Sequence, residues 1–420
     1  MKTLIIGGGA AGMAAAIAAA QRGDDVTVLE RNAKTLKKLG VTGNGRGNLL
    51  NSGNPVYYGD TDFARQIFLT MPYPRLAAFW EDLGVPLRQE EEGRVYPAAM
   101  LASVAADALR LKAKQLRVIC DCHTRALRLF SKGNEFWAEA EEIPPSLPTE
   151  KKKQGIKNEP LSKTYRADRV IVTAGGAAAP AQGSDGSGYP FLTAFGHRLI
   201  PVHPALSALL TETTPISGLK GQRARVKLSL FHGTEKNPIH TTVGEALFAE
   251  DGISGIAAMQ LARFVTAGSR LILDLRPMLN KEDASPDALV AWLQKLCEMR
   301  GELPLSELCT GILPPPLSRA FLKAAGITGL DRSIQNLSRS ALQTLAHTFA
   351  NFPLAIWGVR GFESAQVTAG GIDPADFDPF TLESRLQKGL YAAGEILNVD
   401  GDCGGFNLMF ALASGLLAGQ

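Results

Sequence analysis

Three glycines near the start of the chain, Gly7, Gly9 and Gly12, have the G-x-G-x-x-G spacing that suits the binding of a pyrophosphate. The first glycine allows a tight turn, the second lets a phosphate approach the backbone, and the third lets a helix pack closely on a strand. Glu30 follows at the distance expected for an acid that accepts hydrogen bonds from both hydroxyls of an adenosine ribose. Its charge disfavours a 2′-phosphate. These residues predict a dinucleotide site.

The segments around these glycines have the composition of a strand, a helix and a second strand. Residues 4–6 are apolar and β-branched, residues 13–20 are rich in alanine, and residues 26–29 form another apolar run. Gly23 suits a helix C-cap. A secretory signal is the alternative interpretation, because Lys2 precedes an apolar stretch. The successive glycines, the lack of a clear cleavage site and the strand directly afterwards argue against it.

A glycine-rich loop, TGNGRGN at residues 42–48, follows the second predicted strand. Such a loop cannot form the interior of a stable helix or strand, but it can place many backbone N–H groups against a ligand. A flexible surface turn is the alternative, and the position soon after the strand favours a ligand loop. Arg94 and Tyr96, in the sequence GRVYP, could line a site, although a plain loop is equally consistent with this sequence.

The end of the chain indicates which dinucleotide is bound. NAD and FAD both suit the first motif. Residues 169–176 form a buried strand that ends in glycines, predicted to run parallel to the first strand, and residues 389–395 form a strand that ends in Glu395. A turn is expected at 368–372. Residues 401–407 are glycine-rich and precede a helix at 408–417, whose N-terminus could face the pyrimidine carbonyl of a flavin and favour the negative charge of reduced flavin. Because Glu395 can hold a ribityl hydroxyl and a simple nicotinamide enzyme needs no such return, FAD is predicted.

The bulk properties exclude several classes of protein. The chain has 420 residues and a net charge of +3, which is too small to imply nucleic acid by itself. The five cysteines are odd in number and lack metal-ligand spacing, so we expect no metal and reduced thiols in a cytoplasm. No apolar run reaches the length of a membrane span. Cys403 could be redox-active, but a buried small residue is the preferred interpretation; the six scattered histidines are expected to be structural or exposed.

The middle of the chain is predicted to alternate between helical and β-rich segments. Residues 61–117 are expected to be mainly helical, and a meander of strands is expected at residues 118–122, 126–130 and 136–140. Residues 141–164 are predicted to form a solvated hairpin tip, and the lysine run at 151–153 is interpreted as a solubility feature rather than an RNA contact. Within 195–365, strands are predicted at residues 226–231, 239–243 and 271–275, and amphipathic helices at residues 288–299 and 317–325.

Taken together, the motifs resemble those of the bacterial aminoacetone oxidase/BaiN-like flavoproteins, which are NAD(P)/FAD-dependent oxidoreductases. The resemblance runs nearly end to end, over GGGAAGMAAAIAA, TGNGRGNLLN, GRVYP, VTAGG, GSDGSGYPFLTAFGH, GISG, VTAGGI and GLYAAGEILNVDGDCGGFN. The chain departs from the family pattern in three places. Gly47 replaces the usual cysteine of the glycine loop, Leu36 stands where a glycine is common, and GSDGSGY replaces GSTGDGY. FAD binding survives these changes, whereas a reaction role for the missing cysteine would not.

The resemblance implies an α/β fold with a discontinuous, Rossmann-like FAD-binding domain, an inserted β-barrel-like domain and a small helical domain. We expect the FAD-binding domain at 1–194 and 366–420, the barrel-like domain at 195–255 and 340–365, and the helical domain at 256–339. The motifs and the resemblance together predict these cofactor-binding residues: Gly7, Gly9, Ala10, Ala11, Gly12, Glu30, Arg31, Lys38, Thr42, Gly43, Asn44, Gly45, Arg46, Asn48, Ala126, Thr173, Ala174, Gly175, Gly176, Gly394, Glu395, Gly404, Gly405, Asn407 and Leu408.

The expected activity is that of an FAD-dependent oxidoreductase. It would transfer a hydride between flavin and a small amine, ketone or ring compound, with NAD(P)H or oxygen as the other partner. No Ser-His-Asp, paired-carboxylate or metal constellation is visible in the sequence, so no catalytic acid or base is assigned. Two alternatives stay open: a flavoprotein that binds RNA and a non-catalytic sensor that binds FAD. The sequence does not indicate an oligomeric state.

Overall fold

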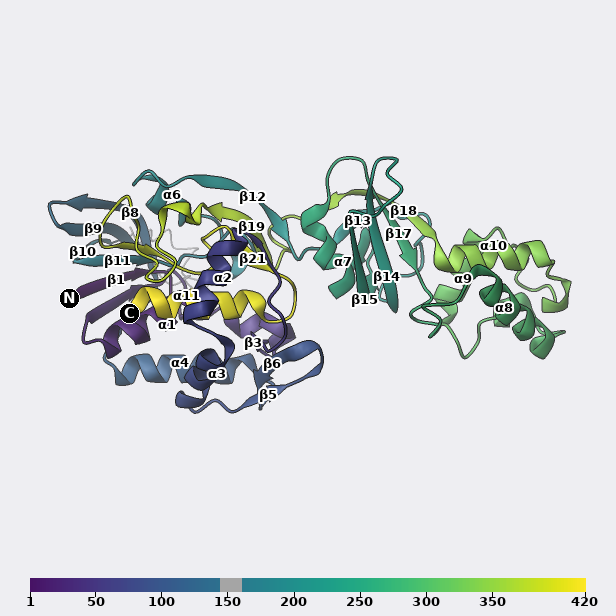
Figure 1. Ribbon diagram of the computed structural model, residues 1–420, viewed down its shortest axis with the longest axis horizontal. Helices are drawn as coiled ribbons and strands as arrows, with labels where there is room; N and C mark the ends of the chain where they lie inside the picture. Colours follow the sequence, from purple (N-terminus) through teal and green to yellow (C-terminus); the bar gives the residue numbers. More distant parts are fainter. Residues whose placement is uncertain (144–160) are drawn as a thin grey trace, which may run out of the picture. The chain divides into compact units, whose positions relative to one another are not determined.

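The computed structural model describes residues 1–143 and 161–420, which form two compact units (Figure 1). The first unit consists of Met1–His203 and Gln366–Gln420, and the second of Pro204–Ala365. The first boundary therefore lies at residues 203/204, whereas the sequence interpretation placed it at 194/195. The lysine run at 151–153 lies outside the described residues.

A five-stranded parallel sheet forms the centre of the first unit. Its strands, in spatial order, are β20 (Leu390–Ala392), β11 (Arg169–Val172), β1 (Lys2–Ile6), β2 (Asp25–Leu29) and β7 (Ile119–Asp121). The predicted parallel pairing of the strand at 169–176 with the first strand is confirmed. The N-terminal segment is the middle strand of this sheet, so it is part of the folded domain. The strand predicted at 118–122 corresponds to β7. It was expected to begin the antiparallel meander, and that prediction was wrong, because β7 pairs in parallel with β2, about 90 residues earlier in the chain.

The other helices and strands of the first unit surround this sheet. The helices are α1 (Ala10–Gln21), α2 (Thr61–Thr70), α3 (Tyr73–Asp82), α4 (Ala102–Gln115), α6 (Tyr189–Thr193) and α11 (Phe406–Gly419), with short 3₁₀ turns η1 (Leu39–Gly45), η2 (Glu91–Gly93), η3 (Pro180–Gln182) and η7 (Pro374–Asp376). The small sheets are β10-β9-β8 (Ser162–Ala167, Glu135–Glu142, Thr124–Lys132), β3-β6-β5 (Leu50–Asn51, Arg94–Pro97, Leu87–Gln89), β21-β4 (Val399–Gly401, Tyr57–Gly59) and β12-β19 (Leu199–Ala205, Val367–Ile372).

The turn expected at 368–372 is instead a strand, β19. Gly370 and Gly371 suggested a turn, and both do have a positive φ. Their role is close approach, because a Cβ on Gly371 would lie 2.8 Å from the Ile396 carbonyl oxygen, and one on Gly370 would lie 2.9 Å from the Pro201 carbonyl carbon. Glycines that admit a neighbouring backbone and glycines that form a turn look alike in a sequence.

The two longest apolar helices, α1 and α11, pack directly against each other (Figure 1). Residues 11–19 of α1 are all buried, which explains why alanine dominates this helix: its whole circumference faces protein. Gly415 and Gly419 of α11 lie against the backbone of Ala11 and Ala15, where a Cβ would overlap the carbonyl oxygens. Small residues thus bring the backbones of the first and last helices into contact.

The second unit contains a closed antiparallel barrel and a group of helices. The barrel strands, in order, are β13 (Leu209–Thr211), β16 (Gly252–Ser254), β15 (His240–Phe248), β14 (Arg223–His232), β17 (Ser269–Asp274) and β18 (Phe352–Val359). The helices are α7 (Ile256–Leu261), α8 (Pro286–Arg300), α9 (Pro315–Ala324) and α10 (Arg339–Ala350), with 3₁₀ turns η4 (Ala262–Phe264), η5 (Leu305–Glu307) and η6 (Ile334–Asn336).

One apolar core joins the barrel to the helices of the second unit. β17 belongs to the barrel although it lies inside the range 256–339 that we expected to be helical. The predicted helices at 288–299 and 317–325 overlap α8 and α9. We keep the division of this unit into a barrel-like and a helical domain as a proposal.

Candidate dinucleotide site

The turn between β1 and α1 has two crowded glycines and one open glycine. A Cβ on Gly12 would overlap the Gly7 carbonyl oxygen and lie 2.7 Å from Thr173 Oγ1, and Gly7 has a φ of 109°. At Gly9, no described atom lies within 4 Å of the position of a Cβ. Gly9 precedes α1, and no side chain of the described residues caps this helix. The turn therefore exposes helical N–H groups next to open space, as anion binding requires.

Glu30 lies directly after β2 and is fixed beside this turn. One carboxylate oxygen accepts the Gly8 N–H at 3.0 Å, and the other accepts both the backbone and side-chain N–H groups of Asn32 at 2.8 Å. Asn32 has no spacing signal in the sequence, and sequence reasoning missed it. Ala126 lies nearby in β8, two residues after Thr124, whose N–H donates to the Glu30 carbonyl at 2.9 Å.

Arg31 faces the loop that follows η3. Its guanidinium forms an ion pair with Asp185 at 2.5 Å. Burial raises the pKa of Asp185, but hydrogen bonds from Ser187 and Arg31 outweigh it, and the pKa lies below its ordinary value. The carboxylate therefore stays charged and ties the GSDGSGY segment to the end of β2.

Lys38 and Glu395, 357 residues apart in sequence, form a half-buried ion pair. Lys38 Nζ donates to one Glu395 oxygen at 2.6 Å, and the Thr368 N–H donates to the other at 3.0 Å. Lys38 also donates to the Ala178 carbonyl at 3.2 Å. The Thr368 hydroxyl oxygen accepts the N–H groups of Ala177 and Ala178 at 2.8 and 2.9 Å. This network, in which Thr368 was not predicted, joins segments from four parts of the chain.

The loop at 42–48 reaches the start of α11. Gly43 and Asn44 both have left-handed backbone conformations, with φ of 57° and 56°. The loop places Asn48 Oδ1 2.7 Å from the position of a Cβ on Gly405. That oxygen is buried and has no hydrogen-bond partner among the described residues. A buried acceptor without a donor marks a place where a ligand can bind.

Gly47, which replaces the usual family cysteine, lies in the same loop. It has a φ of 76°, and a Cβ there would be 2.9 Å from the Ala102 Cα. A cysteine in this backbone would be strained and crowded. The loop thus uses this position for close contact with α4.

Residues Arg94–Pro97 of the GRVYP segment form strand β6, so of the two interpretations left open the plain loop does not apply. Leu50 pairs with Val95 between β3 and β6, and the Arg46 guanidinium lies 5.2 Å from the centre of the Tyr96 ring. Arg94 forms an ion pair with Glu92. The segment therefore lies beside the glycine-rich loop.

Some of the remaining predicted residues follow the parallel strands, and the others lie at the start of α11. Ala10 and Ala11 begin α1, Thr173–Gly176 follow β11, Gly394 follows β20, Gly404 and Gly405 precede α11, and Leu408 is in its first turn. The Thr173 hydroxyl donates to the Gly7 carbonyl at 2.8 Å and so supports the turn. The Asn407 side chain bonds to both the N–H and the carbonyl of Gly401 at 2.8 Å, so it shapes the loop before α11.

The N-termini of helices α1 and α11 point in the same direction. Ala11 lies against Gly415, and Ala15 lies against Gly419, so the two helices run parallel. The start of α11 is nine residues before Gly415, which places it about 14 Å further along the axis at 1.5 Å per residue. The positive ends of two helix dipoles therefore point the same way at different depths.

The described residues offer neither a cluster of metal ligands nor a thiolate at this site. The described residues contain no group of three or more His, Cys, Asp or Glu side chains that could hold a metal ion. All five cysteines are free thiols. Burial raises the pKa of Cys403, so its thiol stays protonated at neutral pH.

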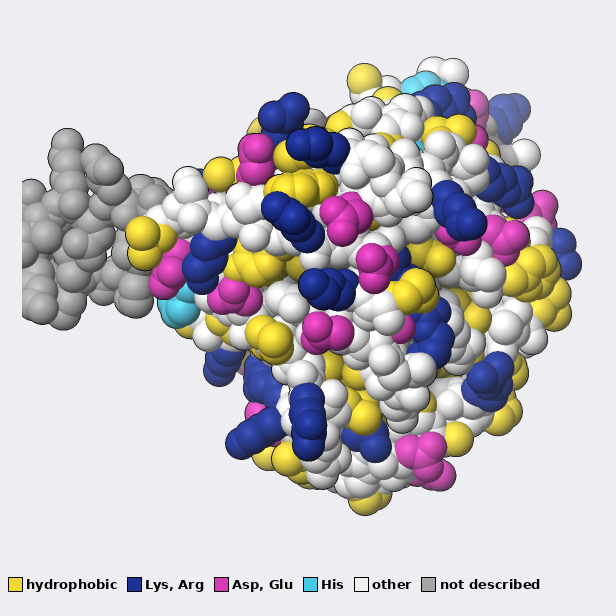
Figure 2. Space-filling model, turned by 90° about the vertical axis from the view of Figure 1, so that its left-hand side faces the viewer, with side chains coloured by type: hydrophobic (Ala, Val, Ile, Leu, Met, Phe, Trp, Pro, Cys, Tyr) yellow, Lys and Arg dark blue, Asp and Glu magenta, His cyan; other side chains and the backbone are white. Residues whose placement is uncertain are grey.

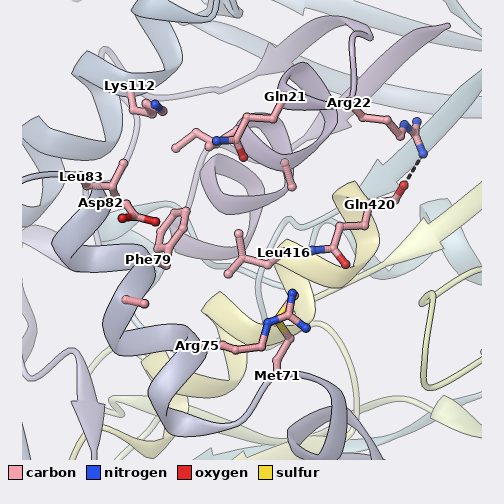
Figure 3. Close-up of a pocket in the computed structure, with 13 residues that line it drawn as sticks. Gln21, Arg22, Met71, Arg75, Phe79, Asp82, Leu83, Lys112, Leu416 and Gln420 are labelled. Atoms are coloured by element: carbon pink, nitrogen blue, oxygen red, sulfur yellow. Dashed lines mark hydrogen bonds between the residues drawn. The ribbon is translucent and has the colours of Figure 1, made fainter.

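A groove of the first unit lies away from this site. A groove of about 940 Å³ is lined by residues near the ends of α1, α3 and α11, including Gln21, Phe79, Leu416 and Gln420 (Figure 3). Gly9 and Gly405 precede the opposite ends of α1 and α11. The groove contains none of the predicted cofactor residues.

The fold and the site together define an FAD-dependent oxidoreductase of the Rossmann class. The chain belongs to the family described as HI0933-like protein Rossmann domain, whose model matches residues 1–420. The resemblance to the aminoacetone oxidase/BaiN-like flavoproteins is thereby confirmed.

Relatives match the chain along its length. It is 33% identical to a 3-dehydro-bile acid delta(4,6)-reductase of Clostridium scindens, over 99% of this chain and 97% of the relative. It is 24% identical to a ribosomal RNA dihydrouridine synthase of Haemophilus influenzae, over 98% of this chain and 96% of the relative. Among solved structures, a 3-ketosteroid-delta4-(5alpha)-dehydrogenase of Rhodococcus jostii matches with a TM-score of 0.46 and 16% identity, covering 100% of this chain and 96% of that one.

Proposed function

We propose that this enzyme reduces a ring carbon–carbon double bond conjugated to a carbonyl group, with NAD(P)H as the source of electrons. The observation that carries the proposal is the 33% identity, over 99% of the chain, to a reductase whose name describes conjugated double bonds in a keto bile acid. A dihydrouridine synthase likewise saturates a ring double bond next to a carbonyl. The two relatives differ in substrate but share this bond type.

The residues at the proposed FAD site fit the parts of the cofactor. The open space at Gly9 and the start of α1 suit the pyrophosphate, and Glu30 suits the adenosine ribose. Glu395, held by Lys38, suits the ribityl chain. The start of α11, about 14 Å further along, suits the flavin ring, where the unpartnered Asn48 Oδ1 offers an acceptor. FAD, when bound and reduced, supplies the hydride.

The chain's own contribution is binding, orientation and charge. The dipole of α11 favours the negative charge of the reduced cofactor. The Lys38–Glu395 pair fixes a carboxylate that would otherwise rotate. The substrate side is proposed to be lined by Arg46, Arg94 and Tyr96, which lie around the glycine-rich loop.

The test is an anaerobic half-reaction with the purified holoenzyme. NADH or NADPH is expected to bleach the flavin, and cyclohexenone or a conjugated keto-steroid is expected to restore its colour. Cyclohexanone, which has no double bond to reduce, is the control and should leave the flavin reduced. Failure of every conjugated carbonyl to reoxidise the flavin would overturn the proposal. If neither NADH nor NADPH reduces the flavin, the protein is better described as a non-catalytic sensor.

RNA is the second candidate substrate, because two relatives are ribosomal RNA dihydrouridine synthases. The charge pattern gives it little support: the net charge is +3, and basic and acidic side chains are interspersed on the face of the first unit in Figure 2. A uridine-containing ribosomal RNA fragment belongs in the same assay. Reoxidation by this fragment but by no small enone would replace the small-molecule proposal.

A cytoplasmic location is part of the proposal. It rests on the five free cysteines, since secreted proteins more often pair theirs. Within residues 1–143 and 161–420, no helix combines the length and apolar character that crossing a membrane requires.

A further inference from the structure

We infer that Tyr96 donates the proton that completes this reduction and that Arg46 stabilises the tyrosinate left behind. The inference rests on the proposed function, because it names the acid for the same reaction. It uses a hydroxyl that the fold leaves without a partner.

Tyr96 belongs to the cluster at the start of α11. Its ring carbon Cε1 lies 3.4 Å from the position of a Cβ on Gly43, and that position is 3.0 Å from the Asn48 nitrogen. Asn48 Oδ1 in turn lies against Gly405. A short chain of contacts therefore links Tyr96 to the part of the site proposed for the flavin ring.

The Tyr96 hydroxyl is free although the residue is buried. Only 4% of Tyr96 is exposed, yet it is not part of the apolar core of the first unit. Nearby tyrosines use their hydroxyls structurally: Tyr57 donates to the Phe406 carbonyl at 2.8 Å, and Tyr58 donates to Asp402 at 2.9 Å. Across the described residues, no hydrogen bond involves the Tyr96 hydroxyl. The hydroxyl oxygen is not among the fully buried atoms that lack a partner, so it keeps some exposure and a small substrate can reach it.

Tyr189 is another buried tyrosine whose hydroxyl has no partner among the described residues, and its surroundings suit it less. Burial and the charge of Glu395 raise the pKa of Tyr189, so loss of its proton is unfavourable. Its side chain is also part of the apolar core. Tyr96 instead has a cation over its ring.

Arg46 is positioned to stabilise negative charge on Tyr96. The left-handed residues of the loop turn Arg46 back so that its guanidinium is 5.2 Å from the ring centre. Within the described parts of the chain, Arg46 forms no ion pair, and its Nε donates only to the Gly43 carbonyl at 3.4 Å. Its charge is therefore not neutralised by a carboxylate, and its position over the Tyr96 ring allows it to attract negative charge that develops on the side chain during proton transfer.

The chemistry balances with one hydride and one proton. The hydride, with both electrons, bonds to the carbon β to the carbonyl. The electron pair of the double bond then takes the proton from the Tyr96 hydroxyl at the α carbon. The O–H electron pair stays on the tyrosine oxygen, beside Arg46, until a water proton restores the hydroxyl. General acid catalysis of this kind contributes about 100- to 10,000-fold to a rate.

The test compares Tyr96→Phe with Tyr73→Phe, a matched change on α3. In Tyr96→Phe, flavin reduction by NAD(P)H and reoxidation by ferricyanide should stay within about two-fold of wild type, because neither needs a proton at carbon. Reoxidation by cyclohexenone should slow by about 100-fold or more. Arg46→Met should slow the same step by about 10-fold, and Tyr73→Phe should change none of the three rates.

Two further measurements do not depend on turnover rate. Binding of cyclohexanone to the oxidised holoenzyme, followed by the flavin spectrum, should stay within about two-fold in Tyr96→Phe, because the hydroxyl faces the α carbon and not the ketone oxygen; a large loss of binding would indicate a binding role instead. In deuterated water, wild type should place deuterium on one face of the α carbon, and Tyr96→Phe should place it on both faces. Flavin content and thermal unfolding establish that each variant is folded.

The outcomes separate the two proposals. Wild-type enzyme that reduces enones while Tyr96→Phe stays within about three-fold, with deuterium still on one face, would overturn the role of Tyr96 alone. Loss of the step in Cys403→Ala but not in Tyr96→Phe would assign the proton to the Cys403 thiol instead. Wild-type enzyme whose reduced flavin reacts with no conjugated carbonyl would overturn the proposed function, and with it this role.

Discussion

Replacing Gly9 by alanine should weaken FAD binding while leaving the fold intact. Gly9 has a φ of −77° and a ψ of −168°, which alanine adopts without strain, and no described atom lies within 4 Å of the added methyl. Alanine is a poorer helix N-cap than glycine, so the apoprotein should lose at most about 1 kcal/mol of stability. The methyl instead occupies the space from which a phosphate reaches the start of α1.

The size of the loss in affinity follows from the number of contacts displaced. A hydrogen bond to a charged group contributes about 1.5–3 kcal/mol. Moving the pyrophosphate away from one of these N–H groups should therefore cost about 1.5–3 kcal/mol, which is roughly a 10- to 150-fold increase in Kd.

Gly12→Ala is the contrasting variant, because there the methyl meets protein. Its Cβ would overlap the Gly7 carbonyl oxygen and lie 2.7 Å from Thr173 Oγ1. α1 and β1 must then separate, and the apoprotein should lose about 1–3 kcal/mol or more. Gly40→Ala is the matched control, since Gly40 also has open space and no positive φ.

The assay has two parts on each variant. FAD affinity is measured by titrating apoprotein with FAD and following flavin fluorescence, and stability is measured by urea unfolding without FAD. Gly9→Ala that binds FAD as tightly as wild type would refute the assignment of this turn to the pyrophosphate. Gly12→Ala apoprotein as stable as wild type would refute the packing argument.

Three further changes test other parts of the site and fold. Lys38→Met removes the half-buried ion pair to Glu395 and should raise the Kd for FAD about 10-fold in the same titration, while the apoprotein loses less than about 1 kcal/mol of stability; an unchanged Kd would contradict the role of the pair. Burial lowers the pKa of His197, so the unfolded chain takes up a proton below about pH 6.5 while the folded protein does not, and stability should fall as the pH drops from about 7 to about 5. His197→Gln should flatten this fall in urea unfolding, and an identical slope would contradict the argument. Cys403→Ser should keep enone reduction within about two-fold, because its protonated thiol is not a nucleophile; a loss above about 10-fold would make the thiol part of the reaction.

The parts of the site that local chemistry dictates could be predicted from the sequence. Gly7, Gly9 and Gly12 each meet a steric requirement that arises within one turn. In the structure, Gly7 and Gly12 have no room for a side chain, and Gly9 faces open space. The start of α11 after Gly405 was predictable for the same reason, because a glycine pair before an apolar helix has a recognisable pattern.

The contacts between distant segments could not be predicted in this way. Lys38 and Glu395 were each expected to contact the cofactor, but nothing in either segment indicates that they pair with each other. Thr368, which donates its N–H to Glu395 and accepts two others at its hydroxyl, lay in a segment expected to be a turn. Side chains whose role is to hold another side chain in place have no characteristic spacing in the sequence by which they could be recognised.

The last residues of the chain are needed to complete the fold of the first unit. The strand β20 supplies one edge of the parallel sheet, and α11 buries one side of α1, so both come from the last 31 residues, 390–420. The Arg169 guanidinium donates to the Ala418 carbonyl at 2.6 Å, and the Gly394 N–H donates to the Ser414 hydroxyl at 3.0 Å. A chain that ends before Leu390 therefore leaves β11 as an unpaired edge and exposes the alanine face of α1. Because Glu395 and the start of α11 belong to the same segment, the proposed flavin end of the site forms only when this last segment packs onto the first helix.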